Sequence, residues 1–173
     1  MPDVSRYIES LPAFHDLSPK ERETLAVVLT PRQVPQATDL FKQGEKAHSF
    51  FIVAEGRLVK LKEFRAHLVE TLGPLEPGDL VGILSMFNRS ERFHTVKAME
   101  DSVVLECTRD TFERLFESQS LFSYKILDKF ASGLSRNVRE ANQLITDIFS
   151  DPKRTLLKLN QTLISAGKRL TTI

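Results

Sequence analysis

The 173-residue sequence has no tryptophan, two tyrosines and a single cysteine, Cys107. A lone cysteine excludes an internal disulfide and any cysteine-based metal cluster made by one chain. Its apolar surroundings in residues 103–107 predict a buried thiol. No apolar run approaches the ~18 residues that a membrane span needs, and the N-terminus lacks the apolar segment of a signal peptide. We therefore expect a cytoplasmic protein that does not enter a membrane.

The sequence also has little net charge, +1, so it has no global field that would attract DNA or an anionic membrane. The charge is uneven, because residues 151–173 contain five basic residues and one acid. We interpret this excess as a solvated helix face, with a nucleic-acid contact as the alternative.

Turn-forming residues are concentrated in the first half of the chain, where five of the seven glycines lie between Gly44 and Gly82. Before them, Ser18-Pro19-Lys20-Glu21 has the cap, proline and glutamate of a helix start. From Pro31 to Cys107 short runs of strand type alternate with turns. Residues 50–54 and 57–62, on either side of Glu55-Gly56, predict a hairpin. Further strands are expected at 67–72, 95–99 and 102–108. Many short strands in sequence predict an antiparallel jelly-roll barrel.

Helical patterns return after Thr108, a candidate N-cap, first over 109–117 and then over about 121–149. The second segment has apolar residues spaced by three and four positions, which is the seam of a coiled coil. The seam begins at Tyr124 and continues through the expected dimer-interface residues Leu127, Ala131, Leu134, Val138, Ala141, Ile145 and Ile148. Asp151-Pro152 starts a last predicted helix.

Three glycine motifs, Phe41-Lys42-Gln43-Gly44, residues 51–56 and Pro77-Gly78-Asp79-Leu80-Val81-Gly82, resemble the framework of the cyclic-nucleotide-binding domain family. The resemblance covers roughly residues 11–149, with the helices and barrel in the family's order. It implies a double-stranded β-helix (jelly-roll) barrel, mainly β, with an N-terminal helix and a long C-terminal dimerisation helix. In this family the backbone N–H groups after the last glycine and a nearby arginine bind the cyclic phosphate.

The candidate ligand-binding residues follow from this resemblance, and they match the family only in part. Gly82, Leu84, Phe87 and Arg92 match the family's pattern, and the candidate ligand-binding residues also include Ser85 and Thr95. Ile83 replaces the carboxylate that accepts a hydrogen bond from the ribose, and Phe93 replaces a serine or threonine that donates to the phosphate. An ionised acceptor of this kind contributes ~1.5–3 kcal/mol, so we expect weak binding of cAMP and cGMP. An ion pair with Glu91 is the structural alternative for Arg92.

The pattern predicts a barrel domain at 1–119, a dimerisation helix at 120–149, and a short helix with a basic tail at 150–173. We expect a non-catalytic regulatory or sensor protein that acts as a homodimer through a small-molecule or protein partner. The alternatives are a genuine cAMP or cGMP receptor with unusual contacts, and a Crp/Fnr-type transcription regulator without its DNA-binding domain. Residues 151–173 are too few for a recognition helix with its support, so we do not expect base-specific DNA binding. No motif indicates a catalytic or metal site.

Overall fold

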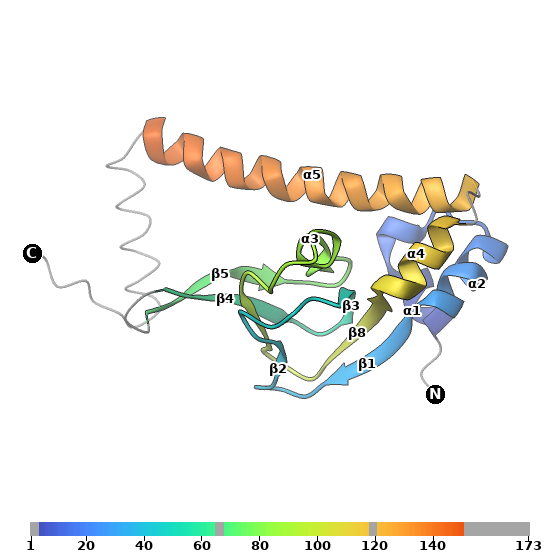
Figure 1. Cartoon of the computed structure of the whole chain (residues 1–173), viewed down its shortest axis with the longest axis horizontal. Helices are drawn as coiled ribbons and strands as arrows, with labels where there is room; N and C mark the ends of the chain where they lie inside the picture. The colour runs from blue at the N-terminus through green and yellow to red at the C-terminus, as the bar shows by residue number, and fades with distance from the viewer. Residues whose placement is uncertain (1–3, 65–67, 118–120, 151–173) are drawn as a thin grey trace, which may run out of the picture. The chain divides into compact units, whose positions relative to one another are not determined.

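The structure is a computed structural model that describes residues 4–64, 68–117 and 121–150. Within these residues eight strands form the middle of the chain, and helices precede and follow them (Figure 1). The helical elements are α1 (Val4–Ser10), the short η1 (Pro12–Phe14), α2 (Pro19–Val28), α3 (Ile83–Phe87), α4 (Arg109–Glu117) and α5 (Leu121–Ser150). The strands are β1 (Thr30–Val34), β2 (Asp39–Phe41), β3 (Ser49–Glu55), β4 (Leu58–Glu63), β5 (Val69–Leu75), β6 (Leu80–Val81), β7 (Thr95–Ala98) and β8 (Ser102–Thr108).

The strands form two antiparallel four-stranded sheets, ordered β1-β8-β3-β6 and β2-β7-β4-β5. Apart from β4 and β5, which pair with each other, strands that follow one another in the chain fall in opposite sheets. This is the arrangement of a jelly-roll barrel, in which a sandwich of two sheets shares one core. The predicted fold class is therefore confirmed.

The predicted hairpin around Glu55-Gly56 is wrong. β3 pairs with β8 and β6, whereas β4 pairs with β5 and β7. Gly56 does have the positive φ of a tight turn, 80°, and a Cβ there would lie 2.3 Å from the hydroxyl oxygen of Ser102. The turn therefore carries the chain from one sheet to the other, because local turn chemistry fixes the bend but not the partner of each arm.

The barrel core is built from both sheets. Its cluster of buried side chains consists of Val34, Leu40, Phe41, Phe51, Val53, Leu58, Leu75, Val81, Val96, Ala98 and Val104. The thiol of Cys107 is buried too, as predicted, and burial raises its pKa to about 12. The other predicted strands lie at or near their expected positions, and β8 has the predicted bounds.

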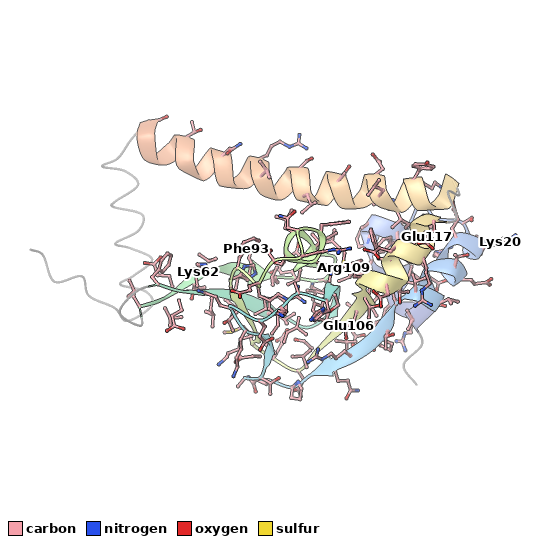
Figure 2. The ribbon with its side chains drawn as sticks, viewed as in Figure 1. Lys20, Lys62, Phe93, Glu106, Arg109 and Glu117 are labelled. Carbon is pink, nitrogen blue, oxygen red and sulfur yellow. The ribbon has the colours of Figure 1, made fainter. Side chains whose placement is uncertain are left out.

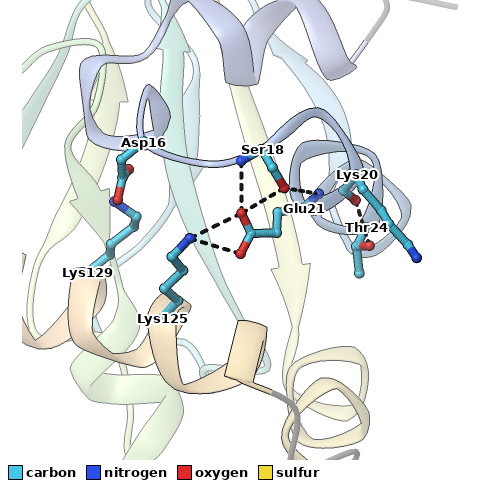
Figure 3. A network of polar contacts seen from close by, with 7 residues as sticks. All are labelled: Asp16, Ser18, Lys20, Glu21, Thr24, Lys125 and Lys129. Carbon is cyan, nitrogen blue, oxygen red and sulfur yellow. Dashed lines mark hydrogen bonds and ion pairs between the residues drawn. The ribbon is translucent and has the colours of Figure 1, made fainter.

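The start of α2 forms the predicted capping box. The Glu21 backbone N–H donates to Ser18 Oγ, and the Ser18 backbone N–H donates to the Glu21 carboxylate at 2.8 Å. The same carboxylate accepts a hydrogen bond from Lys125 of α5 at 2.9 Å, and Asp16 forms an ion pair with Lys129 one turn further along (Figure 3). These bonds lower the pKa of Glu21 to about 2. Two ion pairs and one cap thus attach the first turns of α5 to α2 and the residues before it.

The long helix α5 extends over Leu121–Ser150, within one residue of its expected end. The chain divides into two compact units between Phe130 and Ala131, so α5 contributes to both. The predicted helix and basic tail after Asp151 lie outside the described residues. Among the helices that the structure describes, none is long and apolar enough to cross a membrane.

Candidate functional site

Arg92 precedes β7 and is the charged side chain at the centre of the candidate site. Its guanidinium group is buried, with one nitrogen donating to the Gly82 carbonyl oxygen at 3.0 Å and another to the Ser49 carbonyl oxygen at 2.8 Å. It stacks over the Phe41 ring, 4.2 Å from the centroid. The ion pair with Glu91, the structural alternative for this residue, is absent from the ion pairs of the described residues. Arg92 therefore connects the two sheets, because it precedes β7 of one sheet while Ser49 in β3 and Gly82 after β6 belong to the other.

The charge of Arg92 is only partly balanced by acids. Burial lowers the pKa of Arg92 to about 10, and the charges of Glu45 and Glu106 oppose that shift. Because a pKa of about 10 still leaves the side chain cationic at neutral pH, the site holds a fixed positive charge.

The residues after β6 form the short helix α3, which begins at Ile83 and has Gly82 as its N-cap. Gly82 has a φ of 76°, and a Cβ there would lie 2.2 Å from an Arg92 guanidinium nitrogen. Ile83 is 2% exposed and Ser85 is also buried, whereas Leu84 is 51% exposed. Ile83, which the resemblance aligns with the family's carboxylate, is therefore a buried apolar side chain.

Phe93 and Thr95 have different positions within the site. The Phe93 ring is 50% exposed and lines an open cavity of about 420 Å³ together with Gln43, Gly44, Lys62, Ser90, Glu91 and Arg92. Thr95 accepts a hydrogen bond through its hydroxyl oxygen from the backbone N–H of Gln43 at 3.0 Å. The structure thus brings Gly82, Arg92 and Phe93 together, while Thr95 supports the loop that forms the opposite side of the cavity.

The sequence reading missed two residues of β4, Lys60 and Lys62. On β4 and β7, Leu58 pairs with Ala98 and Lys60 pairs with Val96. Leu58, Ala98 and Val96 all belong to the barrel core. Lys60 therefore lies on the inner face of its sheet, because paired residues of antiparallel strands point to the same side. By the same alternation Lys62 lies on the inner face too. Its ammonium group donates to the Phe93 carbonyl oxygen at 2.6 Å, so Lys62 and Phe93 lie side by side (Figure 2). The pairing of Lys60 with the apolar Val96 would have indicated an inward position for Lys60, but the sequence alone does not show which residue of another strand pairs with it.

His94 is close to these cations. Burial first, and then the charges of Lys60, Lys62 and Arg92, lower its pKa to about 4. Its Nε2 atom is buried without a hydrogen-bond partner among the described residues, as is the hydroxyl oxygen of Ser90. The ring is therefore neutral at physiological pH and lies in a positive field.

A second cavity of about 360 Å³ lies near the start of α4 and is lined by His48, Ser49, Glu106, Thr108, Arg109 and Asp110. Arg109 donates to the carbonyl oxygens of Ala47 and Met86, so its side chain fixes two backbone segments beside α4. Thr108 accepts a hydrogen bond from the Thr111 backbone N–H, which confirms it as a cap of α4. In the part of the chain that the structure describes, no group of three histidine, cysteine or acidic residues could hold a metal ion.

A sequence model of the cyclic nucleotide-binding domain matches residues 31–119. These residues contain both the barrel and the cavity beside Arg92. The chain belongs to the cyclic nucleotide-binding domain family. Its relatives include the cyclic AMP receptor protein of Thermus thermophilus, 32% identical over 134 residues, which cover 76% of this chain and 59% of that protein. The cAMP-dependent protein kinase regulatory subunit of Yarrowia lipolytica is 30% identical over 63% of this chain and 28% of its own length.

The fold agrees with this family. The crystal structure of the Thermus thermophilus catabolite activator protein matches with a TM-score of 0.69 and 29% identity, over 80% of this chain and 63% of that one. The chain thus spans about three fifths of the bacterial relative's length. The relatives bear the names of a receptor and of a regulatory subunit, which is in keeping with a regulatory sensor domain.

The described part of the predicted seam is largely exposed. Leu127 is 40% exposed and Val138 is 57% exposed. Ala131 is exposed as well. Leu134 is half-buried. The side chains of Ala141, Ile145 and Ile148 lie outside the described residues, so the dimer interface stays a prediction.

Proposed function

We propose that this chain is a non-catalytic regulatory module with a cyclic-nucleotide-binding-type barrel whose phosphate cassette is altered, and that it acts as a homodimer. In this proposal the barrel binds cAMP and cGMP weakly, and another ligand or a partner protein controls it. The proposal rests chiefly on Ile83, a buried apolar side chain at the position where the family places a carboxylate.

Ile83 affects the nucleotide in two ways. It offers no acceptor to a ribose hydroxyl, and leaving that hydroxyl without a partner in a buried site costs ~1–3 kcal/mol. Because Ile83 is only 2% exposed, its side chain occupies the buried position and leaves no place there for an acceptor from the surface. Together with the lost ionic hydrogen bond, these penalties correspond to a loss of roughly 10²-fold or more in affinity.

Arg92 supports the same conclusion. Two of its guanidinium nitrogens already donate to the Gly82 and Ser49 carbonyl oxygens. A phosphate would have to compete with these buried bonds or use the N–H groups that remain. Binding energy spent on releasing them reduces the affinity for a singly charged phosphodiester.

Calorimetric titration with cAMP and cGMP tests the altered cassette. The wild-type chain should not bind either nucleotide at low micromolar concentration, whereas Ile83→Glu with Phe93→Ser should recover measurable binding. Arg92→Ala in that double variant should abolish it, and thermal melting must accompany the triple variant because Arg92 also connects the two sheets. Tight binding of cAMP by the wild type would contradict the proposal.

The homodimer has its own test. The exposed seam residues Leu127 and Val138 would leave an apolar stripe in water unless a second helix covered it. Leu134→Arg or Val138→Glu should therefore give a monomer by light scattering at micromolar concentration, while Ser135→Arg, on an exposed non-seam position, should leave the mass unchanged. A dimer of unchanged affinity in the seam variants would exclude this interface without affecting the barrel.

A further inference from the structure

We propose that the cavity beside Arg92 binds a polyanion, a ligand that carries at least two phosphate groups, and that Lys60 and Lys62 on the inner face of β4 bind it. This inference rests on the proposed function, because it names the class of ligand that the altered site takes in place of a cyclic mononucleotide.

The positions of the two lysines are unusual for this residue type. A jelly-roll barrel fills its interior with apolar side chains, and lysine is rarely buried unless it is paired. Here β4 begins on the inner face with Leu58, which is fully buried, and then places Lys60 and Lys62 on that face, both half-buried. The barrel therefore changes from an apolar core to a cationic end along a single strand.

The charges at this end are not matched by acids. Among the described residues no carboxylate lies within ion-pair distance of Lys60 or Lys62. Glu91 lines the same cavity but forms no such pair, and the acids that act on Arg92 are Glu45 and Glu106. A cation that is partly desolvated and lacks an acidic partner favours the binding of an anion, which balances its charge.

Unused hydrogen-bonding groups lie at the same place. Ser90, which lines the cavity, and His94, which is within the field of both lysines, each have a buried side-chain polar atom without a partner in the described part of the chain. Buried polar atoms of this kind are commonly satisfied by a ligand or by ordered water. A cavity of about 420 Å³ has room for a small phosphate-bearing ligand and is within the usual size range of ligand pockets.

The number of cations selects the ligand class. A cyclic mononucleotide carries a single negative charge, whereas two cations, Lys62 and Arg92, line the cavity, and Lys60 lies on the same inner face of β4, two residues before Lys62. Two classes of compound share the required chemistry: linear nucleotides with a di- or triphosphate chain, and cyclic dinucleotides with two phosphodiesters. Both would place a second phosphate beside the lysines when the first lies near Arg92.

Calorimetry on the full chain separates these sources, with inorganic pyrophosphate, ATP, cyclic di-GMP and cAMP as probes at low salt. We expect at least one of the three polyanions to bind at least tenfold more tightly than cAMP. Pyrophosphate alone tests the charge, ATP the linear class and cyclic di-GMP the cyclic class. Raising the salt concentration should weaken binding steeply, because the attraction is screened.

Matched variants test the residues. Lys60→Met and Lys62→Met should each weaken the polyanion by about tenfold or more, since each removes a charged hydrogen bond. Lys62→Arg, which keeps the charge, should stay within about threefold of the wild type. Lys20→Met is the control, because it removes the same charge from α2 at the opposite end of this unit (Figure 2) and should change nothing. Thermal melting of each variant verifies that it is folded.

Each outcome is informative. If the polyanions do not bind and cAMP does not bind either, the present proposal is wrong while the altered cassette stands. If cAMP binds at low micromolar concentration and more tightly than the polyanions, both are wrong. If the polyanions bind but the two lysine variants bind them as well as the wild type does, the ammonium groups extend into bulk water instead and the assigned site is refuted.

Discussion

The two sheets of the barrel face the same core but end differently. On the sheet of β1, β8, β3 and β6, the inner residues Phe51 and Val53 are buried, and the pairing of Phe51 with Glu106 places an acid where the apolar surface ends. On the other sheet the same progression from Leu58 leads to Lys60 and Lys62. One sheet thus ends in a negative charge and the other in positive ones.

Arg92 lies between these two ends. It comes from the loop before β7, which belongs to the sheet with the two lysines. Its guanidinium group donates to the carbonyl oxygens of Gly82 and Ser49, which belong to the other sheet and the turn after it. Glu106 attracts it, while the lysines have no such acid within reach among the described residues. In the sheet of β1, β8, β3 and β6, buried apolar side chains therefore contribute mainly to stability. In the sheet of β2, β7, β4 and β5, charged side chains replace apolar ones at the end where the cavity opens.

The largest expected effect is the difference in the free energy of unfolding between a substitution on the apolar inner face and one on the cationic inner face. Phe51→Ala should lower the free energy of unfolding by about 3–5 kcal/mol, because it leaves a cavity in the core. Lys60→Met, at a half-buried position on the inner face of the other sheet, should change the free energy of unfolding by less than about 1 kcal/mol or raise it, because it removes a partly desolvated cation. Urea denaturation of both variants measures this. Equal losses in the two variants would mean that Lys60 stabilises the fold as a core residue does.

A smaller effect is expected where the two sheets meet. Gly82→Ala should cost about 2–3 kcal/mol, because it forces a side chain into a left-handed conformation and because its Cβ would collide with the Arg92 guanidinium. Gly78→Ala is the control: Gly78 has a φ of 97° but open space around it, so only the backbone strain of about 1 kcal/mol remains. Melting temperatures should fall in that order. If both variants melt alike, Arg92 does not need the space beside Gly82.

Much of this contrast could not be read from the sequence. The capping box at Ser18 and Glu21, the bounds of β8 and the turn at Gly56 were predicted correctly, because each depends on residues near one another in the chain. The hairpin at Gly56 was wrong because the choice of sheet is made by partners far away.

The candidate site followed the same rule. Its members were predictable from the glycine framework, but the direction of the Arg92 side chain was not, since its carbonyl partner Ser49 is 43 residues away. Lys60 was missed because Leu58, Val59 and Leu61 make both faces of β4 read as apolar. Only the register with Val96 decides which face turns inward.

The smallest effect is a pH dependence that belongs to the cationic sheet. His94 has a folded pKa of about 4, against ~6.5 in the unfolded chain, so the unfolded state binds more protons between these values. Stability should therefore fall as the pH drops from about 7 to 4, by roughly 1–2 kcal/mol after allowance for partial solvation of the ring. Charged groups that face His94 are Lys60, Lys62 and Arg92, and all are cationic throughout this window.

The variant His94→Gln should flatten the pH dependence between pH 4 and 7, and His48→Gln, at an exposed histidine, should leave it unchanged. Urea denaturation at stepped pH measures both. A wild-type chain that is equally stable at pH 7 and pH 4.5 would exclude a buried neutral His94.

The hydrogen bond between Glu21 and Lys125 has a consequence for how the chain is made. The two residues are 104 positions apart, so at a synthesis rate of ~5–20 residues per second the lysine leaves the ribosome about 5–20 s after the glutamate. Ser18 is three residues before Glu21, so the partner in the capping box is already present throughout that interval. The local cap can therefore form before the long-range bond that joins α2 to α5.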